Sequence, residues 1–147
     1  MKIIKNLFYL FLPILLGSII GLITSNFIDY SSLIKPPASP PNILFPIIWS
    51  IIYLLMGIAY YFYKKNNDDT NYIYYIQLIV NLLWSIIFFI LKWRFISILW
   101  IILLDILIIS TMKIFKNNSK ISFYLFIPYI IWCLYATYLT IGIYILN

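Results

Sequence analysis

Aromatic side chains at helical spacing are the residues of this sequence whose type and pattern point to ligand chemistry. Trp49, Tyr53 and Gly57 recur at i, i+4 and i+8, directly after the proline-dense stretch KPPASPP at 35–41. Side chains at this spacing share one face of a helix. A row of flat rings suits a planar apolar ligand, because each stacked aromatic pair gains about 0.5 to 1.5 kcal/mol beyond the area it buries. We therefore expect a binding function at this junction.

A second stripe combines amides with aromatic rings. Gln77, Asn81, Trp84 and Phe88 recur at i, i+4, i+7 and i+11, so they lie on one helical face. Amides that face lipid would be costly, and two interpretations are equally favoured. Either the amides form hydrogen bonds between helices, worth on the order of 0.6 to 2 kcal/mol each, or they give a ligand cavity a polar spot.

A third stripe lies near the end of the chain. Trp132, Ala136 and Thr140 follow one another at i, i+4 and i+8 within PYIIWCLYATYLT. The small Ala136 one turn from Trp132 leaves a notch beside a large flat ring. Core packing alone explains any one stripe, but three such stripes together favour a cavity.

Asp105 is the only acidic residue inside a long apolar run. A lone carboxyl group at the centre of a membrane helix costs roughly 2.5 to 3.5 kcal/mol on insertion scales. A protonated or hydrogen-bonded structural acid is favoured over a ligand contact or a proton relay, because one acid without a second is a poor proton pathway.

Several function classes are excluded by the residues that are missing. The sequence has no histidine, a single cysteine (Cys133) and only four glycines, none in a nucleotide-binding pattern. These absences argue against a metal site, a haem ligand and a nucleotide-driven transporter. We therefore expect no cofactor and no metal.

The composition is that of a membrane protein: 65% of the 147 residues are hydrophobic and only 10% are charged. A helix needs roughly 20 apolar residues to cross the hydrocarbon core. We expect one domain, residues 1–147, that is an all-α membrane protein. The five predicted transmembrane helices cover about 7–28, 43–63, 72–91, 95–112 and 123–146.

The first connection is predicted to be a rigid lid over the bundle. Residues 29–42 contain prolines at 36, 37, 40 and 41, which restrict the backbone and remove hydrogen-bond donors. On the first helix, Gly17, Gly21 and Ser25 form a row of small residues, for which close packing of helices is favoured over any ligand role.

The net charge of +6 is explained better by membrane topology than by nucleic acid, because the basic residues lie in the connections and at the helix ends. The rule that basic residues stay inside places the N-terminus inside, and the first loop and Asn147 outside. Seven lysines fall on the inner side and three basic residues on the outer, namely Lys2, Lys5, Lys64, Lys65, Lys113, Lys116 and Lys120 against Lys35, Lys92 and Arg94.

Together these residues resemble the translocator protein family, also called tryptophan-rich sensory proteins or peripheral benzodiazepine receptors. The resemblance covers nearly the whole chain. It is carried by KPPASPP with FPIIWSIIYLLMG, by QLIVNLLWSIIFF from Gln77, and by PYIIWCLYATYL from Pro128.

Membership would imply five transmembrane helices in a bacterial-type plasma membrane, frequent homodimers and a pocket under the first loop. The pocket would bind porphyrins, and in some members sterols or drugs. Strong sterol binding is not supported here, because no basic residue follows Tyr144. Asp105 matches an acid of some members. The resemblance places Tyr30 and Pro41 in the lid and makes Trp49, Tyr53, Asn81, Trp84, Trp132 and Ala136 line the pocket.

Three functions follow as hypotheses. The first is a tetrapyrrole-binding protein that acts as sensor, carrier or scavenger. The second, suggested by the resemblance, is an enzyme that degrades porphyrin under light, in which Trp49 and Trp132 would donate electrons or carry a radical. The third is a regulatory membrane partner whose cavity is incidental.

Overall fold

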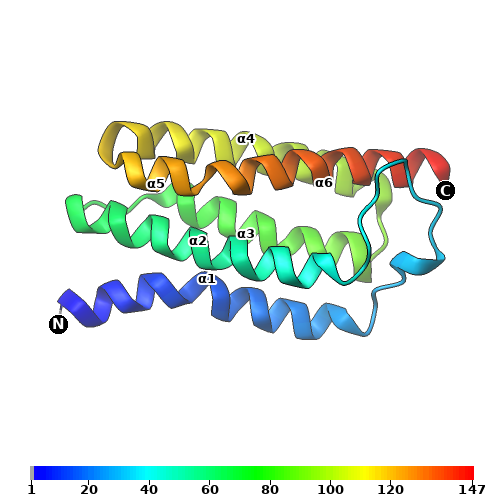
Figure 1. Ribbon diagram of the computed structural model, residues 1–147, viewed down its shortest axis with the longest axis horizontal. Helices are drawn as coiled ribbons and strands as arrows, with labels where there is room; N and C mark the ends of the chain where they lie inside the picture. Colours follow the sequence, from blue (N-terminus) through cyan, green and yellow to red (C-terminus); the bar gives the residue numbers. More distant parts are fainter. Residues whose placement is uncertain (1) are drawn as a thin grey trace.

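The computed structural model describes residues 2–147 as a bundle of long helices that run back and forth along one axis (Figure 1). No strand occurs in this range. The elements in chain order are α1 (Lys2–Ser25), the 3₁₀ turn η1 (Tyr30–Ser32), α2 (Leu44–Asn66), α3 (Tyr72–Ser85), the π-helical turn η2 (Ile86–Ile90), α4 (Arg94–Asn118), α5 (Lys120–Leu125) and α6 (Ile127–Leu146).

The expected helical membrane bundle is confirmed, because five helical segments of residues 2–147 are long and apolar enough to cross a membrane. The third segment joins α3 to η2, and the fifth joins α5 to α6. Pro128 sits in the first turn of α6, where the missing backbone donor costs no helical hydrogen bond.

The helices extend beyond the apolar runs at several ends. α1 begins at Lys2 rather than near residue 7, and α4 continues to Asn118 rather than stopping near residue 112. Lysine has good helix propensity, and its long chain lets the charge reach water from a helix end. Hydropathy therefore marks the membrane core and underestimates the helix length.

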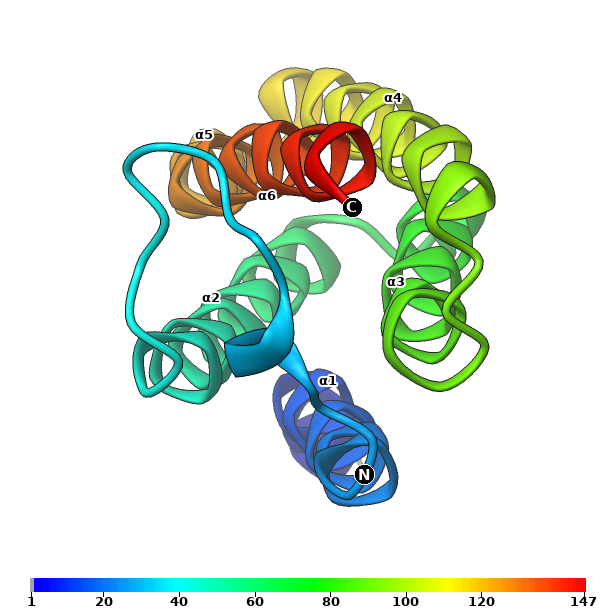
Figure 2. The ribbon, with the colours of Figure 1, turned by 90° about the vertical axis from the view of Figure 1, so that its right-hand side faces the viewer.

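A view along the bundle shows how the helices surround a central region (Figure 2). α1 lies between α2 and α3, and α6 closes the opposite side, while α4 packs against α3 and α6. The segment between α1 and α2 crosses this end of the bundle and reaches α6. We call residues 29–43 the proline-rich loop, this end the loop end, and the opposite end the N-terminal end.

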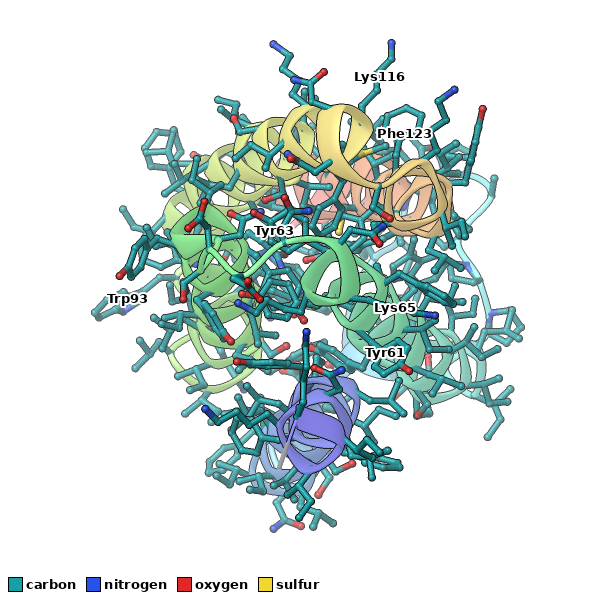
Figure 3. The ribbon with its side chains drawn as sticks, turned by 90° about the vertical axis from the view of Figure 1, so that its left-hand side faces the viewer. Tyr61, Tyr63, Lys65, Trp93, Lys116 and Phe123 are labelled. Atoms are coloured by element: carbon teal, nitrogen blue, oxygen red, sulfur yellow. The ribbon has the colours of Figure 1, made fainter. Side chains whose placement is uncertain are left out.

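The N-terminal half of the bundle is filled by aromatic rings. Tyr60 and Tyr74 stack with centroids 4.0 Å apart, and Phe115 and Phe126 meet edge to face at 4.9 Å. Tyr63 lies inside this end, whereas Lys116 points outward from α4 (Figure 3). These rings leave little free space between the helices in this half of the bundle.

Two glycine contacts hold α1 against α2. A Cβ atom on Gly57 would lie 2.0 Å from the backbone oxygen of Leu10, and one on Gly17 would lie 2.5 Å from the Tyr53 ring. Small residues allow such close approach of membrane helices. The contact fixes Tyr53 and positions α1 for the site described next.

Candidate functional site

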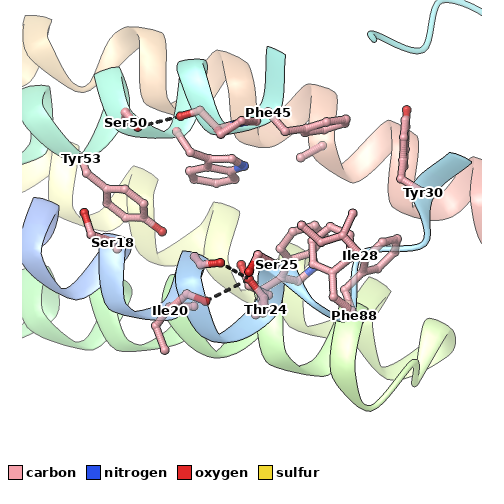
Figure 4. Close-up of a pocket in the computed structure, with 18 of the residues that line it drawn as sticks. Ser18, Ile20, Thr24, Ser25, Ile28, Tyr30, Phe45, Ser50, Tyr53 and Phe88 are labelled. Atoms are coloured by element: carbon pink, nitrogen blue, oxygen red, sulfur yellow. Dashed lines mark hydrogen bonds between the residues drawn. The ribbon is translucent and has the colours of Figure 1, made fainter. Parts of the chain in front are cut away.

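A cavity of about 550 Å³ occupies the loop half of the bundle. This volume falls within the roughly 300–1,000 Å³ of small-molecule sites. Figure 4 shows Phe45, Ser50 and Tyr53 on the α2 side of the cavity and Ser18, Thr24 and Ser25 on the α1 side. The lining is mostly apolar and comes from five elements: α1, α2, α6, the α3–η2 segment and η1.

Three tryptophans from three helices meet on this cavity. Trp49 comes from α2, Trp84 from α3 and Trp132 from α6. Trp49 stacks on Tyr53 at 5.7 Å and meets Trp132 edge to face at 6.4 Å. The i, i+4 spacing on α2 places Trp49 and Tyr53 on one wall. Trp132 reaches them from α6, and this contact depends on how the two helices pack.

The opposite wall is shaped by the π-helical turn. Trp84 stacks on Phe88 with centroids 5.0 Å apart, and both rings line the cavity. The guanidinium of Arg94 lies 4.3 Å from the Phe88 ring centroid and donates to the Phe88 carbonyl oxygen at 2.7 Å. π-helical turns widen a helix and recur at functional sites. Here the turn carries Phe88 and Phe89 on the cavity wall.

Three cavity-lining residues carry a polar atom that has no hydrogen-bond partner. They are the indole nitrogens of Trp84 and Trp132 and the hydroxyl group of Tyr30. Burial raises the pKa of the Tyr30 hydroxyl, which therefore stays neutral and able to donate at physiological pH. Unpaired buried donors are costly, roughly 1 to 3 kcal/mol each. Neighbouring atoms cover all three of these polar atoms, so a ligand acceptor reaches them only when the surrounding side chains move.

The proline-rich loop is fastened to α6. Tyr138 donates its hydroxyl hydrogen to the Pro37 carbonyl oxygen at 2.6 Å, and Tyr135 donates to the Ala38 carbonyl oxygen. Asn147 accepts from the Ile34 amide at 3.1 Å and donates to the Ile34 carbonyl oxygen at 2.8 Å. Residues at the end of the chain therefore set the position of the loop.

Charged groups gather near the start of this loop. Lys92 lies 3.0 Å and Arg94 3.7 Å from the carboxylate of Asp29. The Lys35 ammonium group lies 4.7 Å from the centroid of the Tyr30 ring, and Tyr30 lines the cavity. A cation therefore stands next to one wall of the apolar site.

A chain of hydrogen bonds lies behind the wall that Tyr53 forms. The Tyr53 hydroxyl donates to Asn81 Oδ1 at 2.6 Å, and Asn81 Nδ2 donates to the Tyr129 hydroxyl at 2.7 Å. Tyr129 in turn donates to Gln77 Oε1 at 2.8 Å. The amides of the second stripe thus form hydrogen bonds between helices, while the aromatic residues of the same stripe line the cavity.

The ten site residues expected from the sequence fall into two groups. Seven line the cavity: Tyr30, Trp49, Tyr53, Trp84, Phe88, Trp132 and Ala136. Pro41, Asn81 and Asp105 are not among the lining residues. Asn81 is engaged by two tyrosines, and Asp105 accepts a 2.6 Å hydrogen bond from Thr137 between α4 and α6. Pro41 is exposed on the loop.

The contribution of α1 is larger than the sequence indicated. The small residues Gly17, Gly21 and Ser25 all line the cavity, together with Ser18 and Thr24. Gly17 also packs against Tyr53, so the expected packing role holds for one position of the row. The row of small residues was the available signal, and its spacing fits packing and a cavity wall equally well.

A second hollow, of about 500 Å³, lies at the N-terminal end between the start of α1 and the end of α2. Lys2, Lys5 and Lys64 line it, together with Tyr9 and Asp68. Lys64 donates to the Asp68 carbonyl oxygen at 2.6 Å. This hollow is polar and carries no stacked aromatic wall, so it differs in kind from the cavity at the loop end.

Comparisons with known proteins agree with this architecture. The TspO/MBR family matches residues 9–146. The chain is 37% identical over 124 residues to the tryptophan-rich protein TspO of Chlorobaculum tepidum, covering 80% of this chain and 78% of that protein. It is 39% identical over 122 residues to the TspO protein of Archaeoglobus fulgidus, with 80% and 79% covered. Protein CrtK of Rhodobacter capsulatus is 33% identical over 124 residues, with 80% and 78% covered. The chain therefore belongs to the TspO/MBR family of membrane proteins.

Proposed function

We propose that the chain binds tetrapyrroles of the protoporphyrin type in the loop-end cavity and acts as a sensor, carrier or scavenger. The observation that carries the proposal is the convergence of Trp49, Trp84 and Trp132 on one apolar cavity of about 550 Å³. Flat rings from separate helices offer a disc-shaped ligand several stacking or edge contacts at once.

The polar groups of the site suit the acidic edge of such a ligand. The Tyr30 hydroxyl and the Trp84 and Trp132 indole nitrogens are donors without partners, and Lys35 lies beside Tyr30. Propionate groups would lie toward the proline-rich loop, where the Lys35 ammonium group can pair with them. The macrocycle would then occupy the apolar part, between α2 and α6.

Metal-free porphyrin fits the site better than axially ligated haem. The sequence has no histidine, and Cys133, the single cysteine, is buried and not among the cavity residues. The usual axial ligands of haem iron are histidine, cysteine, methionine and tyrosine side chains. Two tyrosines line the cavity. Tyr53 already uses its hydroxyl group in a hydrogen bond to Asn81, which leaves Tyr30 as the one lining residue of a type that ligates haem iron.

Titration with protoporphyrin tests the proposal. We expect tryptophan quenching and a shifted Soret band in the wild type. In a Trp49→Phe, Trp132→Phe double variant the dissociation constant should be at least about fivefold higher, because two aromatic contacts of about 0.5 to 1.5 kcal/mol each are altered. Trp93→Phe is the matched control, because Trp93 is 56% exposed and lies outside the cavity. Equal affinity in the double variant and the control would exclude the assigned cavity.

A second candidate function is light-dependent oxidative breakdown of the bound porphyrin. One observation favours it: Trp132, Trp49 and Tyr53 form a continuous row of oxidisable rings with centroid separations of 6.4 and 5.7 Å. Dissolved dioxygen would be the oxidant of the porphyrin. Trp49 and Trp132 would act as intermediate electron donors, each oxidised to a radical and then reduced again by the porphyrin within one turnover. If protoporphyrin is bleached no faster in illuminated protein than in detergent alone, the enzyme function is excluded. The proposal that the chain binds porphyrin does not depend on this result.

We also propose an oligomeric state and a membrane orientation for the chain. We expect a homodimer with the N-terminus inside the cell and the proline-rich loop outside, in a bacterial-type plasma membrane. Labelling of single cysteines with a membrane-impermeant reagent checks the orientation: a Ser39→Cys thiol should react from outside, and an Asn117→Cys thiol only after the membrane is opened, because Asn117 is exposed at the opposite end of the bundle. Size-exclusion chromatography with light scattering checks the dimer.

A further inference from the structure

Helices α1 and α2 pack closely along the N-terminal half of the bundle and are separated along the loop half. In the closed half, Gly57 meets the Leu10 backbone and Gly17 meets the Tyr53 ring. The next positions of the same facing rows, toward the loop end, are Gly21 and Ser25 on α1 and Ser50 and Pro46 on α2. At these positions the close contact between the two helices ends.

Gly21 shows the change most clearly. A Cβ atom added to it would find no heavy atom within 4 Å, whereas one added to Gly17, a single turn earlier, would overlap Tyr53. Gly21, Ser25, Pro46 and Ser50 all line the cavity and are all exposed. Figure 4 shows Ser25 on α1 and Ser50 on α2 bordering the same space. The cavity therefore opens sideways between the loop halves of α1 and α2.

The rim of this opening is suited to a lipid environment. The Ser50 hydroxyl donates to the Pro46 carbonyl oxygen at 2.7 Å, and the Ser25 hydroxyl donates to the Leu22 carbonyl oxygen at 2.8 Å. Their donors are thus satisfied within their own helices, as exposure to hydrocarbon requires. Among residues 2–147, no side-chain hydrogen bond or ion pair joins α1 to α2 across the opening.

The loop side of the cavity is fastened instead. Opening the proline-rich loop would break the hydrogen bonds from Tyr135, Tyr138 and Asn147, and the Asp29 ion pair with Lys92. Pro36 is also packed on Gly142, where a Cβ atom would lie 2.6 Å from the proline ring. Hydrogen bonds, an ion pair and a close glycine contact therefore oppose movement of the loop. No contact of these three kinds opposes separation of α1 from α2 at the rim.

We propose that the ligand reaches the cavity from the bilayer through this opening, which we call the α1–α2 portal and define by Gly21, Ser25, Pro46 and Ser50. The proposal rests on the proposed function for the nature of the ligand, a planar molecule that partitions into membranes. The ring passes edge-on between the helices, and the proline-rich loop stays in place. Binding rates then depend on the ligand concentration in the membrane and on the width of the portal.

The experiment uses a reversible plug in full-length protein reconstituted in lipid vesicles. Ser50→Cys places a thiol on the rim, and apolar benzyl methanethiosulfonate attaches a benzyl group that a reducing agent later removes. Tryptophan quenching by protoporphyrin dissolved in the vesicles gives the association rate, and transfer to empty vesicles gives the dissociation rate. Ser110→Cys is the matched control, because Ser110 on α4 also donates to the carbonyl four residues earlier and lies outside the cavity.

We expect the plug to slow association and dissociation at least fivefold, with the equilibrium constant changed less than threefold, and reduction to restore both rates. The plugged control and treated wild type should keep their rates. A second variant, Tyr138→Phe with Asn147→Ala, loosens the loop and should leave the association rate within twofold. The portal would be overturned by association and dissociation rates that do not change when the plug is attached. It would also be overturned by an association rate that rises at least fivefold when the loop is loosened.

A ligand-free measurement separates failure of the portal from failure of the proposed function. Lipids with brominated acyl chains should quench the tryptophan fluorescence of the empty protein, and the plug at Ser50→Cys should reduce that quenching because Trp49 borders the portal side of the cavity. Unchanged quenching overturns the portal whatever the ligand is. Reduced quenching without any porphyrin binding at equilibrium supports the portal and excludes the tetrapyrrole function.

Discussion

The two halves of the bundle use aromatic residues in opposite ways. At the N-terminal end, Tyr60, Tyr74, Phe115 and Phe126 pack on one another and are almost completely buried. At the loop end, Trp49, Trp84 and Trp132 border a cavity, and two of their indole nitrogens lack partners. Rings that fill space stabilise the fold, whereas rings that border space leave contacts for a ligand.

The glycines repeat this contrast. Gly57 is needed because the Leu10 backbone occupies the place of a side chain, whereas Gly21 borders open space. A small residue in a membrane helix can therefore serve helix packing or keep a passage open. Only the neighbour across the contact distinguishes the two roles.

Removing a ring from the filled half should have the largest effect on stability. Tyr60→Ala should lower the free energy of unfolding by about 3 to 5 kcal/mol, the usual cost of truncating a buried aromatic residue. Phe45→Ala at the half-buried cavity wall should cost less than half as much. Unfolding by sodium dodecyl sulfate in mixed micelles measures both. Equal losses would show that the two halves are packed alike.

The glycine contrast predicts a smaller difference. Gly57→Ala should lower the free energy of unfolding by about 1 to 3 kcal/mol, the range for overpacked positions, because the new methyl group overlaps the Leu10 carbonyl group. Gly21→Ala should stay within about 0.5 kcal/mol of the wild type, as substitutions away from packed features do. The same titration applies, and a destabilised Gly21→Ala would argue that α1 meets another chain there.

Removing the Tyr129 hydroxyl group, which lies behind Tyr53, should lower the free energy of unfolding by about 1 to 3 kcal/mol. Tyr129→Phe leaves Asn81 Nδ2 and Gln77 Oε1 without their partner, and unpaired buried polar groups carry a penalty of this size. Thermal unfolding in detergent checks the loss of stability. Tyr138→Phe, which removes an exposed hydroxyl group, is the control and should change the midpoint much less.

The smallest expected effect concerns the proline-rich loop. Asn147→Ala removes two hydrogen bonds to Ile34, and exposed hydrogen bonds contribute about 0.5 to 1.5 kcal/mol each. Amide hydrogen exchange should become faster at Ile34 and its neighbours while the helices stay protected. Unchanged exchange at residues 33–35 would mean that the other contacts of the loop are sufficient to hold it.

Much of the fold could be predicted because the bilayer imposes simple rules. Apolar runs separated by lysines or prolines identify all five spans, and the prolines of the first connection lie in its second half, before α2. The exact helix ends could not be predicted, because lysine continues a helix as readily as it ends an apolar run. The π-helical turn at Ile86–Ile90 also has no signature in its five apolar residues.

The site could be predicted where spacing along one helix decides which residues share a face. Trp49 with Tyr53, Trp84 with Phe88, and Trp132 with Ala136 are such pairs, and all six line the cavity. Asn81 lies on the correct face but is engaged by tyrosines from α2 and α6, a contact that depends on distances between helices. The role of α1 was missed for the same reason.

The most direct test of the proposed function is an experimental structure of the chain with protoporphyrin in a lipid environment. We expect the macrocycle in the loop-end cavity, in contact with Trp49 and Trp132 and with its propionates near Tyr30 and Lys35. A macrocycle held instead at the N-terminal end, with its propionates on Lys2, Lys5 and Lys64, or one lying on the lipid-facing surface with the cavity empty, would contradict it.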